Sequence, residues 1–297
     1  MNPLDPPVTA VRAVVARALA EDLEPLGDVT SALLPQGAMA VADFVSRQDG
    51  VVAGTACVLE TMAQVDRDLR VTWLLPDGSE LVPGARLGRV EGPLASILTA
   101  ERTALNFLCH LSGVASITRR FVVAATGGVR IWDTRKTTPG LRALEKAAVR
   151  AGGGSNHRGN LSEWILLKDN HLAGLSITEA VARAHERWPG RTVQTEADRL
   201  NQVREAIAAG ADIVLLDNMT PDEVRACVEL RGGADRPLLE VSGGVNLDNV
   251  AAYALTGVDL ISTSVITSSA PSVDIGLDVV GAETVPGDSP TGPVRVR

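Results

Sequence analysis

Residues 133–171 read DTRKTTPGLRALEKAAVRAGGGSNHRGNLSEWILLKDNH, and this stretch decides how the rest of the chain is interpreted. An apolar run at 129–132 leads into it, a helical pattern occupies 141–150, three glycines end that pattern, and a second apolar run follows at 164–167. This order is typical of a parallel sheet whose strands are joined by helices. Because polar residues stand directly after each apolar run, we predict them at the carboxyl ends of the strands.

The same stretch is cationic, although the chain as a whole is acidic. Residues 133–168 hold seven cationic and three anionic side chains, whereas the 297-residue chain has a formal net charge of −8. The cations are Arg135, Lys136, Arg142, Lys146, Arg150, Arg158 and Lys168, and two histidines, His157 and His171, stand among or beside them. We expect a small anionic ligand here and no nucleic acid, because a nucleic-acid backbone needs a broad positive surface.

The composition favours a globular protein of the cytoplasm. Hydrophobic residues make up 45% of the chain, which is enough for a sizeable core. No uncharged run has the length and apolarity of a membrane span, and the first residues do not resemble a secretory signal, so we expect no membrane association. Cys57, Cys109 and Cys227 are odd in number and widely spaced, which indicates buried, reduced thiols rather than a zinc site.

From residue 129 onward, strand and helix patterns alternate. The apolar runs are 129–132, 164–167, 192–193, 213–216, 238–241 and 258–261, and the helical segments are 141–150, 177–188, 200–209, 221–230 and 247–255. Near-continuous apolar strands separated by amphipathic helices indicate a parallel sheet covered by helices. A barrel, complete or one or two strands short, is the simplest closure. A doubly wound open sheet is the alternative, although no GxGxxG motif opens a helix.

The region before residue 116 has the mixed pattern of an α+β domain. A helix is predicted at 8–23, strands at 39–45, 50–54 and 69–75, and a hairpin turn at Asp77-Gly78 between 74–75 and 81–82. A longer helix is predicted at 94–114, with Leu94, Leu98, Leu105 and Cys109 on one apolar stripe.

Arg102 lies inside that apolar stripe, with Glu101 beside it. A cation on an apolar face must be paired or must reach into a polar site. Arg102 therefore either pairs with a nearby carboxylate, such as Glu101, or projects across an interface to hold an anionic ligand. The spacing alone leaves both possibilities open.

The residues that follow the later strands share one character, because they are charged or are glycine and serine. They are Arg135 and Lys136, then Lys168, Glu196, Asp217, Ser242-Gly243-Gly244, and residues 262–264. In a βα barrel such residues surround a single mouth. The cations and His157 suit a dicarboxylate, a phosphate or both. Glu196 and Asp217 suit Mg²⁺ or sugar hydroxyls, and Ser242-Gly243-Gly244 before a helix suits a phosphate.

Several segments of the chain resemble the quinolinate phosphoribosyltransferase family. They are EDLEPLGDVTS at 21–31, ERTALNFLCHLSGVAS at 101–116, DTRKTTPGLRALEKAAVRAGGGSNHRGNL at 133–161, LLKDNH at 166–171, LLDNM at 215–219 and EVSGGV at 240–245. The likeness extends to about residue 280, and the block at 133–171 is long and specific.

The resemblance implies a fold and a reaction. The family joins an N-terminal α/β sandwich domain, here 1–115, to an incomplete α/β barrel, here 116–270. Residues 271–297 would return to the N-terminal domain, and the last of them would be mobile. The family condenses quinolinate with 5-phosphoribosyl 1-diphosphate, requires Mg²⁺, and releases CO2 and diphosphate to give nicotinate mononucleotide. It acts as a homodimer or larger assembly.

The resemblance also implies roles for individual residues. Lys136, Lys168, Glu196 and Asp217 form the catalytic set, with Glu196 and Asp217 facing the ribose and the metal. Arg135, Lys136, Thr137, His157, Arg158 and Lys168 line the substrate sites, and Ser242, Gly243, Gly244 and Ser264 lie at the 5-phosphate. Arg102 is lent across the dimer interface.

Two departures and three alternatives qualify this picture. Gln194 replaces an acidic residue of the family pattern, which could alter metal or hydroxyl contacts, and Ser264 replaces a glycine. The alternatives are a relative that uses a different pyridine, a barrel aldolase with Lys168 as a Schiff-base amine, and a non-catalytic sensor of a phosphorylated ligand.

Overall fold

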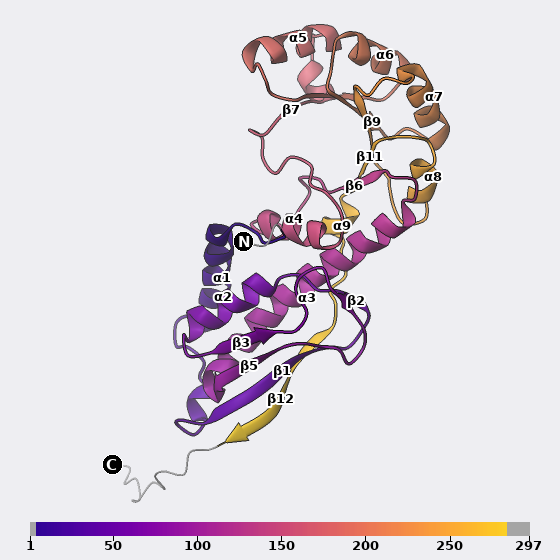
Figure 1. The fold of residues 1–297 in the computed structure, drawn as a ribbon. Coiled ribbons are helices and arrows are strands. Elements are labelled where there is room, and N and C mark those ends of the chain that lie inside the picture. Colours follow the sequence, from indigo (N-terminus) through magenta and orange to yellow (C-terminus); the bar gives the residue numbers. More distant parts are fainter. Residues whose placement is uncertain (1–3, 284–297) are drawn as a thin grey trace, which may run out of the picture.

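The computed structural model describes residues 4–283, and they form two large sheets that share one long helix (Figure 1). One sheet has four antiparallel strands and the other has six parallel strands, and β2 (Gly50–Val51) pairs with β4 (Glu80–Leu81) in a small third sheet. The mobility predicted for the end of the chain concerns residues that lie outside the described ones. No helix within residues 4–283 is both long and apolar enough to cross a membrane.

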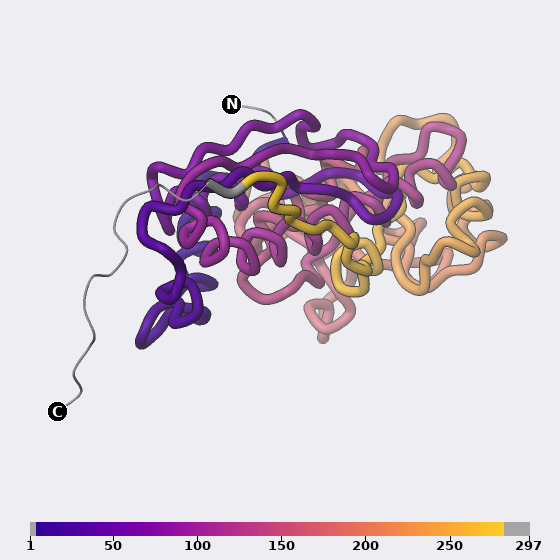
Figure 2. The backbone as a smooth tube through the Cα atoms, turned by 90° about the horizontal axis from the view of Figure 1, so that it is seen from below, coloured from indigo at the N-terminus to yellow at the C-terminus, as the bar shows by residue number. Residues whose placement is uncertain are grey.

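The antiparallel sheet has the strand order β12-β1-β5-β3. Its strands are β1 (Met39–Ser46), β3 (Arg70–Trp73), β5 (Arg86–Pro93) and β12 (Ile275–Glu283). Alternating burial along β1 places Ala40, Ala42 and Phe44 in the core. The C-terminal strand β12 pairs with β1, so it runs back along the N-terminal region, as the yellow segment in Figure 2 shows.

The predicted hairpin around Asp77-Gly78 is wrong. Strand β3 pairs with β5, and β4 pairs with β2 instead of with β3. The Asp77 carboxylate instead accepts hydrogen bonds from the backbone N–H groups of Gly54 at 3.1 Å and Thr55 at 3.2 Å. These groups begin helix α2 (Thr55–Val65), which the sequence patterns did not predict. A carboxylate at a helix start satisfies N–H groups that have no partner within the helix.

Helix α3 (Leu94–Ala124) connects the two cores. Its first half packs Ile97, Ala104 and Leu108 into the core of the antiparallel sheet, and its second half packs Val114 and Phe121 into the core of the parallel sheet. The predicted stripe is therefore misplaced, because Leu105 is the only one of its four apolar residues that is buried. The buried face combines large side chains such as Leu108 and Leu111 with small residues such as Ala100 and Ala104.

The parallel sheet has the order β6-β11-β10-β9-β8-β7. Its strands are β6 (Arg130–Trp132), β7 (Ile165–Leu167), β8 (Val193–Ala197), β9 (Ile213–Asp217), β10 (Leu238–Ser242) and β11 (Leu260–Ser262). The joining helices are α4 (Arg142–Ala151), α5 (Ile177–Arg187), α6 (Leu200–Ala208), α7 (Pro221–Arg231), α8 (Val250–Ala254) and α9 (Val265–Ser268), and α5 to α8 lie along the convex side (Figure 1). Among the described strands, β6 and β7 are the two edges, so the predicted incomplete barrel is confirmed.

The segment after α4 covers the free edge of β6. Ser155 N–H donates to the Ile131 carbonyl at 2.8 Å, and Asp133 N–H donates to the Ser155 carbonyl at 3.2 Å. Glycine is required just before this contact, because a Cβ atom on Gly152 would clash with the Ala115 carbonyl of α3. The edge contact brings the polar residues 155–158 to the carboxyl end of β6.

Candidate active site

A cavity of about 530 Å³ lies at the carboxyl ends of the parallel strands. It is lined by Thr134, Arg135, Lys136, His157, Arg158, Leu166, Lys168, Leu215, Asp217, Asn218, Glu240, Ser242, Gly243, Gly244 and Ser262. Nine of the thirteen predicted site residues are in this lining, and Arg102, Thr137, Glu196 and Ser264 are not. The parallel sheet therefore gathers residues that are up to 128 positions apart in the sequence.

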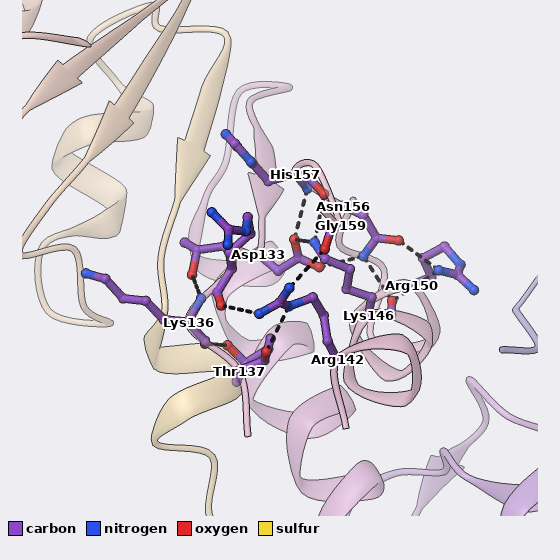
Figure 3. Close-up of polar contacts among 12 residues, drawn as sticks. Asp133, Lys136, Thr137, Arg142, Lys146, Arg150, Asn156, His157 and Gly159 are labelled. Carbon is purple, nitrogen blue, oxygen red and sulfur yellow. Dashed lines mark hydrogen bonds and ion pairs between the residues drawn. The ribbon is translucent and has the colours of Figure 1, made fainter. Parts of the chain in front are cut away.

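Four of the seven local cations line the cavity, and the other three are used inside the protein. Arg142 is the clearest internal case (Figure 3). Its guanidinium donates to Thr137 Oγ1, to the Gly159 carbonyl and to the Arg135 carbonyl, each at 3.1 Å. These bonds tie the loop after β6 to the loop after Arg158. Thr137 thus contacts Arg142 rather than the cavity.

Lys146 and Asp133 form a buried ion pair beneath the cavity (Figure 3). The Asp133 carboxylate also accepts hydrogen bonds from Asn156 Nδ2 at 2.6 Å and from the His157 backbone N–H at 2.9 Å, and Lys146 Nζ donates to the His157 carbonyl at 2.7 Å. Burial raises the pKa of Asp133 and lowers that of Lys146, and each partner's charge opposes that shift. The pair therefore holds His157 by both of its backbone polar groups.

His157, Glu240 and Gln194 form a buried polar group at the base of the cavity. His157 Nε2 lies 3.7 Å from Glu240 Oε2, which accepts a hydrogen bond from Gln194 Nε2 at 2.7 Å. Burial, reinforced by the charges of Lys146 and Arg158, lowers the pKa of His157 to about 3, so its ring is neutral at neutral pH. Burial raises the pKa of Glu240 to about 7.

The sequence patterns do not predict a role for Glu240, although it lines the cavity. The available signal was a single carboxylate within the otherwise apolar strand β10, because an ionisable residue there must be paired or functional. Gln194 was expected to affect metal or hydroxyl contacts. It is instead fully buried, where it contacts Glu240 and accepts a hydrogen bond from Trp164 Nε1 at 3.0 Å.

Buried polar atoms without hydrogen-bond partners concentrate at this cavity. They include Arg135 Nε, His157 Nδ1, Arg158 Nε and Glu240 Oε1, together with Trp132 Nε1 at the end of β6. The Ser262 hydroxyl is near enough to lower the pKa of Glu240, yet it makes no well-formed hydrogen bond to Oε1. An unsatisfied buried donor costs about 1–3 kcal/mol, so a cluster of them indicates a site whose partner is a ligand.

The two predicted acidic residues stand at the mouth. Glu196 lies outside the lining and pairs with Lys168, whereas Asp217 lines the cavity and accepts a hydrogen bond from Asn218 Nδ2 at 2.8 Å. Within residues 4–283 there is no group of three or more His, Cys, Asp or Glu placed to hold a metal ion. Mg²⁺ is commonly held by one or two carboxylates plus phosphate oxygens, so Asp217 fits such an ion when a phosphorylated substrate completes the ligands.

The glycine loop after β10 differs from the predicted phosphate cradle in one respect. Helix α8 begins at Val250 and has only five residues, so the loop does not lie at the start of a long helix. Gly243 and Gly244 have φ values of +94° and +64°, and a Cβ atom on Gly243 would clash with the Asn218 side chain. Any phosphate contact therefore comes from the loop, where close approach of two loops requires glycine.

Arg102 and Ser264 are not among the residues that line the cavity. Arg102 is exposed on α3, and no ion pair with Glu101 or another described carboxylate is formed. Its position inside an apolar stripe was therefore predicted wrongly. Ser264 precedes α9, whose Thr267 hydroxyl donates to the Lys136 carbonyl at 2.7 Å, so α9 supports the cationic loop from behind.

Both regions of the chain are similar to known proteins. Residues 28–112 match the family model "Quinolinate phosphoribosyl transferase, N-terminal domain", and residues 114–278 match "Quinolinate phosphoribosyl transferase, C-terminal domain". A nicotinate-nucleotide pyrophosphorylase (carboxylating) of Mycobacterium leprae is 41% identical over 277 residues, which covers 91% of this chain and 97% of the relative. A probable nicotinate-nucleotide pyrophosphorylase (carboxylating) of Methanothermobacter thermautotrophicus is 43% identical over 260 residues, or 85% and 92% of the two chains. The nicotinate-nucleotide pyrophosphorylase structure from Francisella tularensis superposes with a TM-score of 0.88 at 37% identity and covers 93% of this chain and 98% of that chain.

Proposed function

The chain belongs to the quinolinate phosphoribosyltransferase family, and on that premise we propose that it transfers the phosphoribosyl group of 5-phosphoribosyl 1-diphosphate to quinolinate. The products are nicotinate mononucleotide, CO2 and diphosphate, which makes the chain a pentosyltransferase of NAD biosynthesis. The observation that carries this assignment is the cavity, where four cations converge and buried nitrogens of Arg135, His157 and Arg158 lack partners. Such a site suits a rigid ligand with two carboxylates.

The cationic wall orients the pyridine. Arg135 and Arg158 each present a planar guanidinium that can bind a carboxylate by two parallel hydrogen bonds. His157 is neutral and fixed by the Asp133–Lys146 pair, so it adds a hydrogen bond without adding charge. Holding both carboxylates leaves the ring nitrogen as the nucleophile that faces the sugar.

The first chemical step exchanges one bond at the anomeric carbon for another. The bond from ring nitrogen to carbon forms as the bond from carbon to diphosphate oxygen breaks, and the electron pair leaves with diphosphate. Positive charge builds on the sugar, where Glu196 and Asp217 stabilise it, while Lys136 and Lys168 stabilise the leaving group. Mg²⁺ held by Asp217, and by Glu196 once it separates from Lys168, would neutralise charge on the diphosphate.

The second step removes CO2. The bond between the ring and the adjacent carboxylate breaks, and its electron pair stays on the ring carbon. The positive charge of the ribosylated nitrogen stabilises that pair until a proton arrives. Contacts from Arg135 and Arg158 position the departing carboxylate, and they must not bind it more strongly than the transition state.

The remaining parts of the proposal concern phosphate, assembly and location. Ser242, Gly243 and Gly244 would hold the 5-phosphate, with Ser264 supporting that end of the site. Because Arg102 is exposed and is not among the residues that line its own cavity, we propose that it completes the site of a second copy in a homodimer or larger homo-oligomer. We propose that the domain boundaries lie after residues 115 and 270. We also propose a cytoplasmic location, because the three cysteines are not paired in disulfides.

The decisive experiment mixes the protein with quinolinate, 5-phosphoribosyl 1-diphosphate and Mg²⁺ and follows nicotinate mononucleotide and CO2. We expect turnover that stops when EDTA removes the metal and returns when Mg²⁺ is added. Turnover of nicotinate in place of quinolinate would instead support a relative with another substrate. Binding of both substrates without release of diphosphate would contradict the proposal and favour a sensor.

Subunit complementation tests the role of Arg102. Arg102→Ala and Asp217→Ala are each expected to be inactive alone. Mixed and reassembled in equal amounts, they should regain about a quarter of wild-type activity, because half of random dimers are mixed and each mixed dimer has one intact site. A mixture as inactive as either variant would show that Arg102 serves no neighbouring site.

A further inference from the structure

Glu240 is buried against His157 and has no role in the proposed reaction. Glu240 is fully buried in the middle of β10 and still lines the cavity. Its Oε2 faces His157 Nε2 at 3.7 Å, and its Oε1 has no well-formed hydrogen bond. His157 Nδ1, the other ring nitrogen, is also buried and without a partner. Both ends of the pair therefore have unused polar atoms beside the ligand space.

A neutral imidazole has only one N–H, so its two nitrogens cannot both be donors. When Glu240 is ionised, the favourable arrangement turns Nε2–H toward it and leaves Nδ1 as a bare acceptor. A ligand carboxylate facing Nδ1 would then meet a lone pair. One additional proton removes this conflict, because it makes Glu240 a donor to Nε2 or makes both ring nitrogens donors, and in each case Nδ1–H faces the ligand.

We propose that binding of the dianionic substrate takes up one proton at the Glu240–His157 pair, with Glu240 as the positioning residue that orients the His157 ring. This inference rests on the proposed function, since it deepens how that site recognises its dicarboxylate. The proton count is the same whether the proton resides on the carboxyl group or on the ring, so the proposal does not depend on the choice of tautomer.

The charged neighbours of the pair disfavour the additional proton while no ligand is bound. Around Glu240, Leu215 of β9 and Leu260 of β11 lie beside it in register, and Gln194 and Ser262 add neutral polar groups. Lys168, directly after β7, is the charged group that acts on Glu240, and it favours the ionised form. Around His157, the charges of Lys146, Arg158 and Lys168 all disfavour a second ring proton.

The direction with pH follows from these groups. The pKa of Glu240 in the free protein is about 7, so below pH 7 the proton is already present and binding requires little uptake. Above pH 7 each bound dianion must draw a proton from solution, and the dissociation constant should rise by up to about tenfold per pH unit. Ordinary carboxylates remain ionised over this range, so the ligand itself contributes no change.

The test measures proton uptake by calorimetry in buffers that differ in ionisation enthalpy. The probes are quinolinate and benzene-1,2-dicarboxylate, which has the same adjacent carboxylates and no ring nitrogen. For the wild-type protein we expect close to one proton per ligand at about pH 8 and close to none at about pH 6, given the pKa of Glu240.

Glu240→Gln should abolish the uptake and make affinity independent of pH, because the carboxamide is always a donor. Glu179→Gln, which alters an exposed carboxylate on α5, is the matched control and should keep the wild-type uptake. If Glu240→Gln does not fold, His157→Asn removes the other member of the pair and should also abolish the uptake.

Three outcomes separate this inference from the proposed function. Normal turnover with no proton uptake by the wild type, or full uptake by Glu240→Gln, would overturn the inference alone. Proton-linked binding of the dicarboxylates without formation of nicotinate mononucleotide would support the inference and overturn the proposed function. Failure of both dicarboxylates to bind would overturn both.

Discussion

The antiparallel sheet and the parallel sheet each bury an aspartate, and the pKa values of these two aspartates shift in opposite directions. In the first, Asp43 accepts hydrogen bonds from Arg89 Nε at 2.7 Å and Nη2 at 3.1 Å, and these bonds lower its pKa despite burial. In the second, burial prevails and the pKa of Asp133 is raised, although Lys146, Asn156 and the His157 backbone all contact it. The Arg89 side chain reaches solvent, whereas Lys146 is itself buried.

The same contrast holds for unsatisfied polar atoms. Among the described residues, the antiparallel sheet leaves one such buried side-chain atom, Trp73 Nε1, whereas five lie in or beside the cavity of the parallel sheet. A region whose buried polar atoms nearly all have hydrogen-bond partners within the protein contributes stability and no binding site. A region that leaves buried donors free has a lower stability on its own and gains from a ligand.

The largest expected effect comes from Lys146→Met. This change leaves Asp133 buried without its cation, so the free energy of unfolding should fall by about 3–5 kcal/mol, as for other broken buried pairs. The matched change in the other sheet is Arg89→Met, which leaves Arg86 to pair with Asp43 and should lower the free energy of unfolding much less. Denaturant unfolding of both variants measures the difference, and equal losses would contradict the contrast.

Arg135→Ala should mainly weaken quinolinate binding. Loss of a charge-assisted contact to a carboxylate should raise the KM for quinolinate by about 100-fold, with a much smaller change in the KM for 5-phosphoribosyl 1-diphosphate. Arg130→Ala, at the exposed start of the same strand, is the control and should change neither constant. An unchanged quinolinate KM in Arg135→Ala would remove Arg135 from the dicarboxylate site.

Arg142→Lys should have the smallest of these effects. Lysine keeps the charge but cannot make three hydrogen bonds in fixed directions, so the loops that carry Arg135 and Arg158 should become less well positioned. We expect about a tenfold rise in the quinolinate KM, with kcat largely retained. Arg183→Lys, at an exposed position on α5, is the control and should leave the quinolinate KM unchanged. A fall in kcat without a change in KM would assign Arg142 another role.

The βα region was predictable because its information is local. Apolar runs and helical spacing fixed the six strands to within a few residues, and polar residues at the strand ends then had to share one edge of the sheet. The first region was less predictable, since the pairing of β2 with β4 and the capping of α2 by Asp77 depend on contacts that span more than twenty residues. Helix α2 has only 11 residues, too few for its apolar spacing to stand out from that of the neighbouring strands.

Within the site, the sequence identified which residues carry charge but not which of them face the cavity. Arg142, Lys146 and Arg150 appear equivalent to Arg135 and Arg158 when counted along the chain. Their side chains instead donate hydrogen bonds to backbone carbonyls and to Asp133. Helix α4, which carries them, lies behind the loops that hold Arg135 and Arg158. Facing direction is set by packing, so no count of cations could separate the two groups.

By itself, the sequence determined the alternation of strands and helices, a parallel sheet covered by helices, and the gathering of cations and carboxylates at one mouth. These follow from local periodicity and from the rule that parallel strands end at a common edge. Only the tertiary structure decided that Glu240 is buried against His157, that Gln194 supports it, and that Arg102 points into solvent. Burial and pairing arise from distant segments brought together, and the protonation states of the site depend on both.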